Sequence, residues 1–105
     1  MNQIGEGVLV KIPCKVQKGA FPDEYLITFS ADGKDVSGFV RKEDVEMKNL
    51  EEGFIEGKVI LVDGGHVTIQ IRGSFFTGAA GKISVSSTWS DSNLALVPQD
   101  DYHRH

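Results

Sequence analysis

Every even position from Val8 to Val16 is apolar, and this alternation limits what the chain can fold into more than any other feature. Among the odd positions between them only Leu9 is apolar, whereas Lys11 and Lys15 are charged. Successive side chains of a β-strand point to opposite faces, so the pattern predicts a strand that is buried on one side. The same alternation returns at Val67, Ile69 and Ile71. The chain is therefore expected to build its core from half-buried strands.

Turn signals divide the chain into short segments. Twelve of the 105 residues are glycine, and Asp32-Gly33 and Gly64-Gly65 stand between apolar runs, which is typical of hairpins. We predict a three-stranded meander over residues 6–45 and a second over 56–97, joined by a connector over 46–55. A meander this small cannot bury its apolar face alone, so the two halves are expected to share one core.

The predicted fold is all-β: one small barrel of about five to seven short antiparallel strands, SH3-like or OB-like. It is expected to occupy residues 1–98, and residues 99–105 are expected to form a frayed tail. Two separate miniature barrels are the less favoured arrangement.

Two segments carry further local predictions. Pro13 cannot donate a ladder hydrogen bond, so the first strand is expected to be an edge strand or to bend there. Residues 41–52 are the single helical candidate, as a short helix or a 3₁₀ turn, with Val45, Leu50 and Met47 facing inward.

Composition and charge argue against several classes of protein. The formal net charge is −4, which disfavours a nucleic-acid partner without excluding a local basic stripe. A single cysteine allows no internal disulfide, and no apolar run is long enough to span a membrane. We therefore expect a cytoplasmic protein with no membrane partner.

Residues for catalysis are not gathered in any recognisable pattern. Cys14 lies on the inward side of the first strand, where a thiol is inert. No metal cluster and no glycine-rich phosphate loop occurs. His103 and His105 are spaced to share a metal, but they stand in a tail that has no core to order the site. The sequence predicts neither a cofactor nor enzymatic activity.

Two partial resemblances support a small binding barrel. The segments Leu50-Glu51-Glu52-Gly53, Glu56-Gly57-Lys58-Val59 and Val62-Asp63-Gly64-Gly65 resemble the opening of an S1-type RNA-binding domain, which implies an OB-fold barrel. Ser37-Gly38-Phe39-Val40 followed by Glu43-Asp44-Val45 resembles an SH3-type barrel, which implies a binding module without a particular ligand. At the outward strand positions where S1 domains carry aromatic residues, this chain has polar ones.

Aromatic residues outside the strand alternation are the first candidates for a binding site, because exposed aromatics at loop tips often mark interaction surfaces. The predicted partner-binding residues are Phe75, Phe76, Phe21 and Trp89. The competing interpretation is that such residues cap the open ends of the barrel. The favoured function is binding of another protein, and self-association through an open strand edge is equally compatible.

The alternative function is weak binding of RNA or DNA by the outward polar face of the second half. The residues predicted for it are His66, Gln70, Arg72 and Lys82. Because two permanent cations neutralise few phosphates, such binding is expected to be weak and sensitive to salt.

Overall fold

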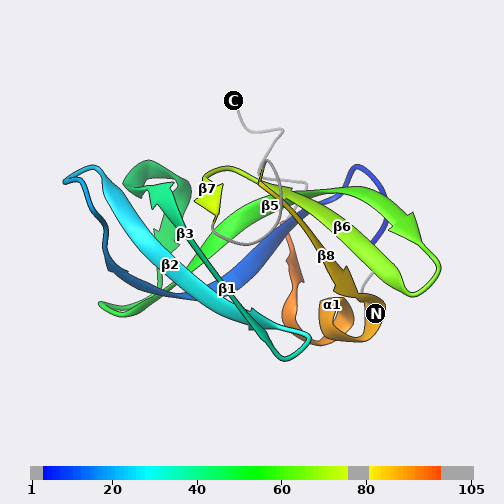
Figure 1. Cartoon of the computed structure of the whole chain (residues 1–105). Coiled ribbons are helices and arrows are strands. Elements are labelled where there is room, and N and C mark those ends of the chain that lie inside the picture. The colour runs from blue at the N-terminus through cyan, green and yellow to red at the C-terminus, as the bar shows by residue number, and fades with distance from the viewer. Residues whose placement is uncertain (1–3, 76–80, 98–105) are drawn as a thin grey trace.

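The alternating segments fold as antiparallel strands in the computed structural model, which describes residues 4–75 and 81–97 (Figure 1). In chain order, the first half contains β1 (Leu9–Lys18), β2 (Glu24–Ala31), β3 (Lys34–Arg41), the 3₁₀ helix η1 (Lys42–Asp44) and β4 (Val45–Met47). The second half contains β5 (Glu52–Asp63), β6 (His66–Ile71), β7 (Ser74–Phe75), β8 (Lys82–Ser86), helix α1 (Ser87–Asn93) and β9 (Ala95–Leu96). The predicted all-β class is confirmed.

The strands form one sheet in the order β7-β3-β2-β1-β5-β6-β8, in which β4 also pairs with β5 and β9 with β1. β1, β2 and β3 make one antiparallel meander, and β5, β6 and β8 make a second. The two meanders are joined by β1 and β5, whose antiparallel register runs from Leu9↔Lys58 to Lys15↔Glu52. The two meanders therefore form one continuous sheet.

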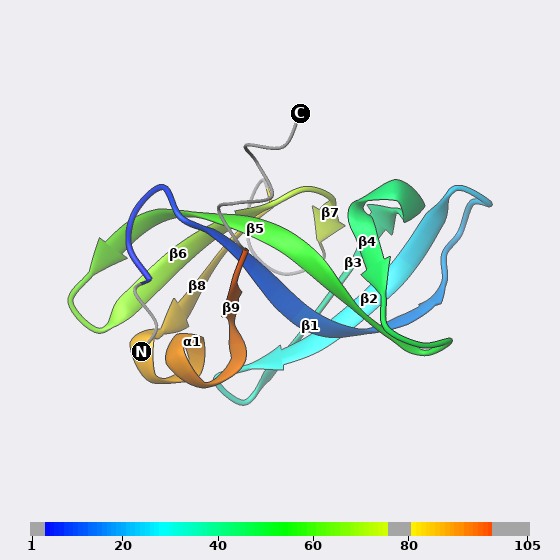
Figure 2. The same ribbon diagram turned by 180° about the vertical axis from the view of Figure 1, so that it is seen from behind.

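The sheet curls into a half-barrel, and two contacts draw distant parts of it together (Figures 1 and 2). β7 follows β6 in sequence but pairs with β3, at Gly38↔Phe75. At the tip of the β2–β3 hairpin, the Asp32 carboxylate accepts hydrogen bonds from the Ser86 N–H at 2.8 Å and from Ser86 Oγ at 2.6 Å. These bonds tie the hairpin tip to the end of β8, across the open side of the sheet.

The core lies on the concave side of this curl. The even positions of β1 from Val10 to Val16 are buried, as the alternation predicts, and so are the odd positions of β6 from Val67 to Ile71. β5 approaches β6 closely at Gly57, where a Cβ would lie 2.5 Å from Ile69 Cγ2. A glycine is required at this point because any side chain would collide with the core.

Pro13 lies in the central strand β1, and the structure explains how that strand accepts it. β2 pairs with β1 only from Lys15↔Thr28 onward, and on the same side β9 pairs at Val10 and Lys11. Pro13 lies in the gap between these two partners, where a missing N–H interrupts no ladder. The prediction of an edge strand is therefore replaced by a change of neighbour within a central one.

The helical candidate, residues 41–52, contains a 3₁₀ turn at Lys42–Asp44, as one of the two alternatives predicted, but most of it is not helical. After η1 the chain extends as β4, which pairs with β5. The prediction that Leu50 and Met47 face inward is wrong: their side chains are 94% and 39% exposed, whereas Val45 packs against the core. The reason is that residues sharing one face of a helix do not share one face of a strand and turn.

Helix α1 was not predicted from the sequence. Its first turn is capped by Ser86, whose Oγ accepts a hydrogen bond from the Trp89 N–H at 3.1 Å. Serine is a favoured residue at this position because its oxygen satisfies a backbone donor that the helix leaves unpaired. Ser86 thus ends β8, begins α1 and holds Asp32.

Candidate functional site

The aromatic residues predicted to bind a partner are not gathered in one place. Phe21 is 65% exposed in the loop between β1 and β2, whereas Trp89 lies on α1, on a different part of the molecule (Figures 1 and 2). Phe75 belongs to β7, beside β3, and Phe76 lies outside the described residues. The described part of the chain therefore offers no cluster of these four residues.

Trp89 has structural contacts that occupy its ring and its indole N–H. The ring lies 6.2 Å from that of Phe29, in a stacked arrangement, and Nε1 donates a hydrogen bond of 3.0 Å to the Ser30 carbonyl. Continuing the β1–β2 register beyond Lys15↔Thr28 would place Ser30 opposite Pro13, which has no N–H to give. The Trp89 indole thus supplies the Ser30 carbonyl with a hydrogen-bond donor at the gap in the sheet.

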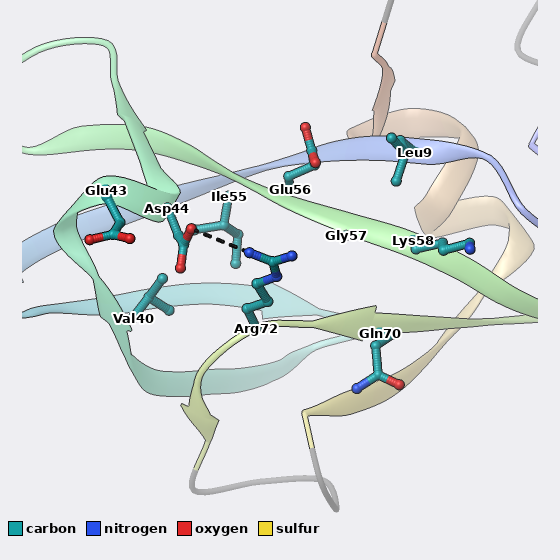
Figure 3. A pocket seen from close by; sticks show the side chains of 10 residues that line it. All are labelled: Leu9, Val40, Glu43, Asp44, Ile55, Glu56, Gly57, Lys58, Gln70 and Arg72. Carbon is teal, nitrogen blue, oxygen red and sulfur yellow. Dashed lines mark ion pairs between the residues drawn. The ribbon is translucent and has the colours of Figure 1, made fainter. Parts of the chain in front are cut away.

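Three of the four polar residues of the alternative prediction share one face: His66, Gln70 and Lys82. Gln70 of β6 is opposite Lys82 of β8, and on its other side it is opposite Lys58 of β5. His66 lies on the same side as Gln70, because alternate residues along a strand share a face, whereas Arg72 follows the end of β6 and points toward Asp44 (Figure 3). Sequence reasoning missed Lys58, since only the register shows that it completes a row of three strands. This set of five residues, Arg72 included, is called the polar face below.

A pocket of about 440 Å³ opens where β4 and β6 diverge (Figure 3). β4 and β6 both pair with β5 along the edge opposite to β1. Glu56 lies between the part of β5 that pairs with β4 and the part that pairs with β6. Across this fork, Arg72 Nη1 lies 4.0 Å from Asp44 Oδ1, and Figure 3 shows the two side chains pointing toward each other. The Arg72 side chain is 86% exposed, so this ion pair contributes little to stability.

The fork pocket has mixed charge, since two cations and three carboxylates line it (Figure 3). These charged residues are Arg72, Lys58, Glu43, Asp44 and Glu56. Side chains of opposite sign that compensate one another do not select an anion or a cation. The pocket therefore gives no chemical reason to assign it a particular ligand.

A rigid turn between β4 and β5 displays an apolar side chain to solvent. Asn49 Oδ1 accepts hydrogen bonds of 2.9 Å from the N–H groups of both Glu51 and Glu52, and its Nδ2 donates one of 2.9 Å to Glu52 Oε1. The N–H groups of Lys48 and Asn49 both donate to the Glu52 carbonyl. Asparagine favours such turns because its side chain bonds the backbone two residues on. The turn holds Leu50, which projects outward almost fully exposed.

Leu50 forms one wall of a groove of about 520 Å³ that we call the Leu50 groove. Its lining residues are Val16, Gln17, Lys18, Tyr25, Met47, Lys48, Asn49 and Leu50. The groove lies between the β1–β2 hairpin and the β4–β5 turn, which are at the same end of the molecule in Figure 2. The buried Val16 is at its base, and tyrosine, methionine and leucine side chains surround it; tyrosine and methionine are enriched at protein interfaces.

The charge around the Leu50 groove differs from that of the chain as a whole. Lys18 and Lys48 line the groove and no acidic residue does. Lys42 lies over the Tyr25 ring, with Nζ 5.1 Å from the ring centroid, as a cation–π pair. The lining of this groove thus carries two cations in a chain of net charge −4, while Glu51 and Glu52 line an adjoining pocket that shares Leu50.

Metal-binding groups are not brought together in residues 4–75 and 81–97, and the one cysteine is buried. Cys14 is buried, as predicted, and its Sγ lies 3.6 Å from the Gly53 carbonyl. Burial raises the pKa of the Cys14 thiol from 9.0 to about 11, which keeps it protonated and unreactive at neutral pH. Within these ranges no three His, Cys, Asp or Glu side chains are placed to hold a metal ion.

Comparison with known proteins gives no further guide to the site. No protein-family model, curated protein or solved structure matches this chain. The resemblances to SH3-type and S1-type barrels therefore stay predictions. Among the described helices, none has the length and apolar character that crossing a membrane requires.

Proposed function

We propose that this chain is a non-enzymatic binding protein of the cytoplasm that docks a protein partner in the Leu50 groove. The observation that carries the proposal is Leu50 itself, which is 94% exposed on a turn fixed by side-chain and backbone hydrogen bonds. While it is exposed to water, the Leu50 side chain contributes little to the free energy of folding of the isolated protein. Burying it against a partner would contribute about 1.5–3 kcal/mol.

Preorganisation makes this turn a favourable anchor. Ordering a flexible loop on binding costs free energy. The hydrogen bonds of Asn49 already order this turn in the free protein, so binding would not require that step. The neighbouring side chains of Tyr25 and Met47 extend the apolar surface beside Leu50. A partner residue entering the groove would therefore meet three large side chains above the base formed by Val16.

The proposal is tested by affinity capture from the native cytosol with three forms of the protein. Leu50→Ser removes the anchor, and Leu61→Ser makes the same change at a leucine that is 47% exposed, near the far end of β5. We expect a partner that wild type and Leu61→Ser retain equally and that Leu50→Ser binds about 10- to 100-fold more weakly. Equal retention by Leu50→Ser would contradict the proposal.

A Phe75→Ser/Phe76→Ser variant in the same series tests the loop aromatics. If that variant alone lost the partner, the docking site would be at these residues and not at the Leu50 groove.

Analytical ultracentrifugation of each variant tests self-association, which would appear as a dimer whose population depends on protein concentration.

Nucleic-acid binding is the second candidate, favoured by the row that Lys58, Gln70 and Lys82 form across three strands. If the polar face binds RNA, Arg72→Ala and Lys82→Ala should each weaken binding of a labelled single-stranded RNA, and added salt should weaken it further. Lys48→Ala, on the β4–β5 turn at the other end of the molecule, is the matched control. Binding that is unchanged in both variants would exclude the polar face.

A further inference from the structure

We infer that the occupant of the Leu50 groove is an extended, acidic segment of another protein that carries a large apolar residue. This inference rests on the proposed function and specifies the chemistry of the partner. Two properties of the groove support it: the sign of the charge at its rim, and an open strand edge at its base.

The charge at the rim selects an acidic occupant. Lys18 and Lys48 line the groove, Lys42 covers the Tyr25 ring, and no carboxylate is part of the lining. Complementary charge around an apolar contact speeds association and rejects partners of the wrong sign. A second copy of this chain, docked through the same groove about a two-fold axis, would bring the lysines of both copies together, which is unfavourable.

The open strand edge favours an extended occupant. On the side facing the groove, β1 is bonded to β5 as far as Lys15↔Glu52, and the Val16 N–H then donates to the Glu51 carbonyl at 2.8 Å. β1 continues to Lys18, whose N–H and C=O face this edge while those of Gln17 face β2, and no strand among the described residues pairs with the edge there. An added strand could bond to it, as in other cases of peptide binding at a sheet edge.

Together these features describe how the segment would bind. Its backbone would run beside Gln17 and Lys18, and its apolar side chain would pack between Leu50 and Tyr25. Acidic side chains flanking that residue would lie near Lys18 and Lys48. The apolar contact would supply most of the affinity, and the charges would supply the choice of partner.

The test is selection of displayed random peptides on wild-type protein, with peptides that also bind Leu50→Ser removed. We expect the remaining peptides to carry a large apolar residue and an excess of Asp and Glu. For the most enriched peptide, Lys18→Glu/Lys48→Glu should weaken binding about tenfold or more, whereas Lys34→Glu, away from the groove, should leave it unchanged.

The outcomes separate this inference from the proposed function. Leu50-dependent peptides that are neutral or basic, or whose binding is unchanged in Lys18→Glu/Lys48→Glu, would overturn the inference and leave the docking site standing. A selection with no Leu50-dependent peptide would overturn both. Leu50-dependent dimerisation in ultracentrifugation would also overturn the inference, because the occupant would then be a second copy.

Discussion

Asp32 shows how much of this fold depends on single polar side chains. Its carboxylate joins the β2–β3 turn to Ser86, and the two hydrogen bonds from Ser86 lower the pKa of Asp32 below its ordinary value of 3.8. Asp32 also has a φ of 54°, in the left-handed region that aspartate and asparagine tolerate better than most residues.

Replacing Asp32 by asparagine should destabilise the protein in a pH-dependent way. A group with a lowered folded-state pKa stabilises the fold fully above its ordinary pKa, and this contribution is lost as the pH falls through the lowered pKa. The gap between wild type and Asp32→Asn in thermal melts should therefore be present at neutral pH and close below pH 3.8. Asp35→Asn removes the same charge from the same hairpin and serves as the control. A gap that persists unchanged in acid would contradict the role of the carboxylate.

Cys14 should be almost inert toward alkylation in the folded protein. Raising the pKa from 9.0 to about 11 lowers the thiolate fraction near neutral pH by about 100-fold, and the thiolate is the reactive form. Iodoacetamide labelling, followed by mass spectrometry, should be at least that much slower in native buffer than in urea. Similar rates in both conditions would show that the thiol is accessible and its pKa ordinary.

At the scale of the elements, α1 is best understood as a cover for the gap between β1 and β2. Trp89 stacks on Phe29 and bonds to Ser30 at the gap beside Pro13, where β1 and β2 are not paired. Trp89→Phe keeps an aromatic ring but removes the hydrogen bond, so we expect a loss of about 0.5–1.5 kcal/mol in the free energy of unfolding.

Urea titration followed by circular dichroism measures this loss, since the variant has no tryptophan fluorescence. Trp89→Leu removes the stacking as well and should cost more than Trp89→Phe. If Trp89→Phe were as stable as wild type, the indole N–H would contribute nothing at the gap.

The strands could be predicted because their alternation directly reflects burial, as Val10 to Val16 illustrate. The start of β5 could not, because Glu52 to Gly57 contains two glutamates and two glycines, and tertiary pairing with β1 and β4 makes it a strand. Helix α1 was missed because its Ser- and Asp-rich sequence has no apolar stripe; its Ser86 cap and Trp89 contacts depend on the folded sheet.

The candidate site was harder to predict than the fold. A helix over residues 41–52 would place Leu50 in the core, although Asn49 beside it is a turn signal. The Leu50 groove combines Val16, Tyr25 and Met47 from three strands, and only the register and the curl of the sheet bring these residues together. The polar face could be predicted in part, because alternation along β6 aligns His66 and Gln70, whereas Arg72 follows the end of that strand.

At the scale of the whole molecule, the two ends differ in what they present to solvent. The end with the β1–β2 hairpin and the β4–β5 turn carries the Leu50 groove and its lysines, and the opposite end carries the β5–β6 hairpin (Figures 1 and 2). Leu61, near that hairpin, is an exposed leucine about 30 Å along β5 from Glu52. This separation allows one surface to be tested against the other in the same molecule.

The most direct measurement is photocrosslinking in living cells, with a photoreactive amino acid at position 47 in one form and at position 61 in another. Position 47 lies on the groove wall and leaves Leu50 in place. We predict a discrete crosslinked protein adduct from position 47 that Leu50→Ser abolishes, and no such adduct from position 61. Adducts from position 61 alone, or adducts from position 47 that survive Leu50→Ser, would contradict the assignment of the Leu50 groove as the docking site.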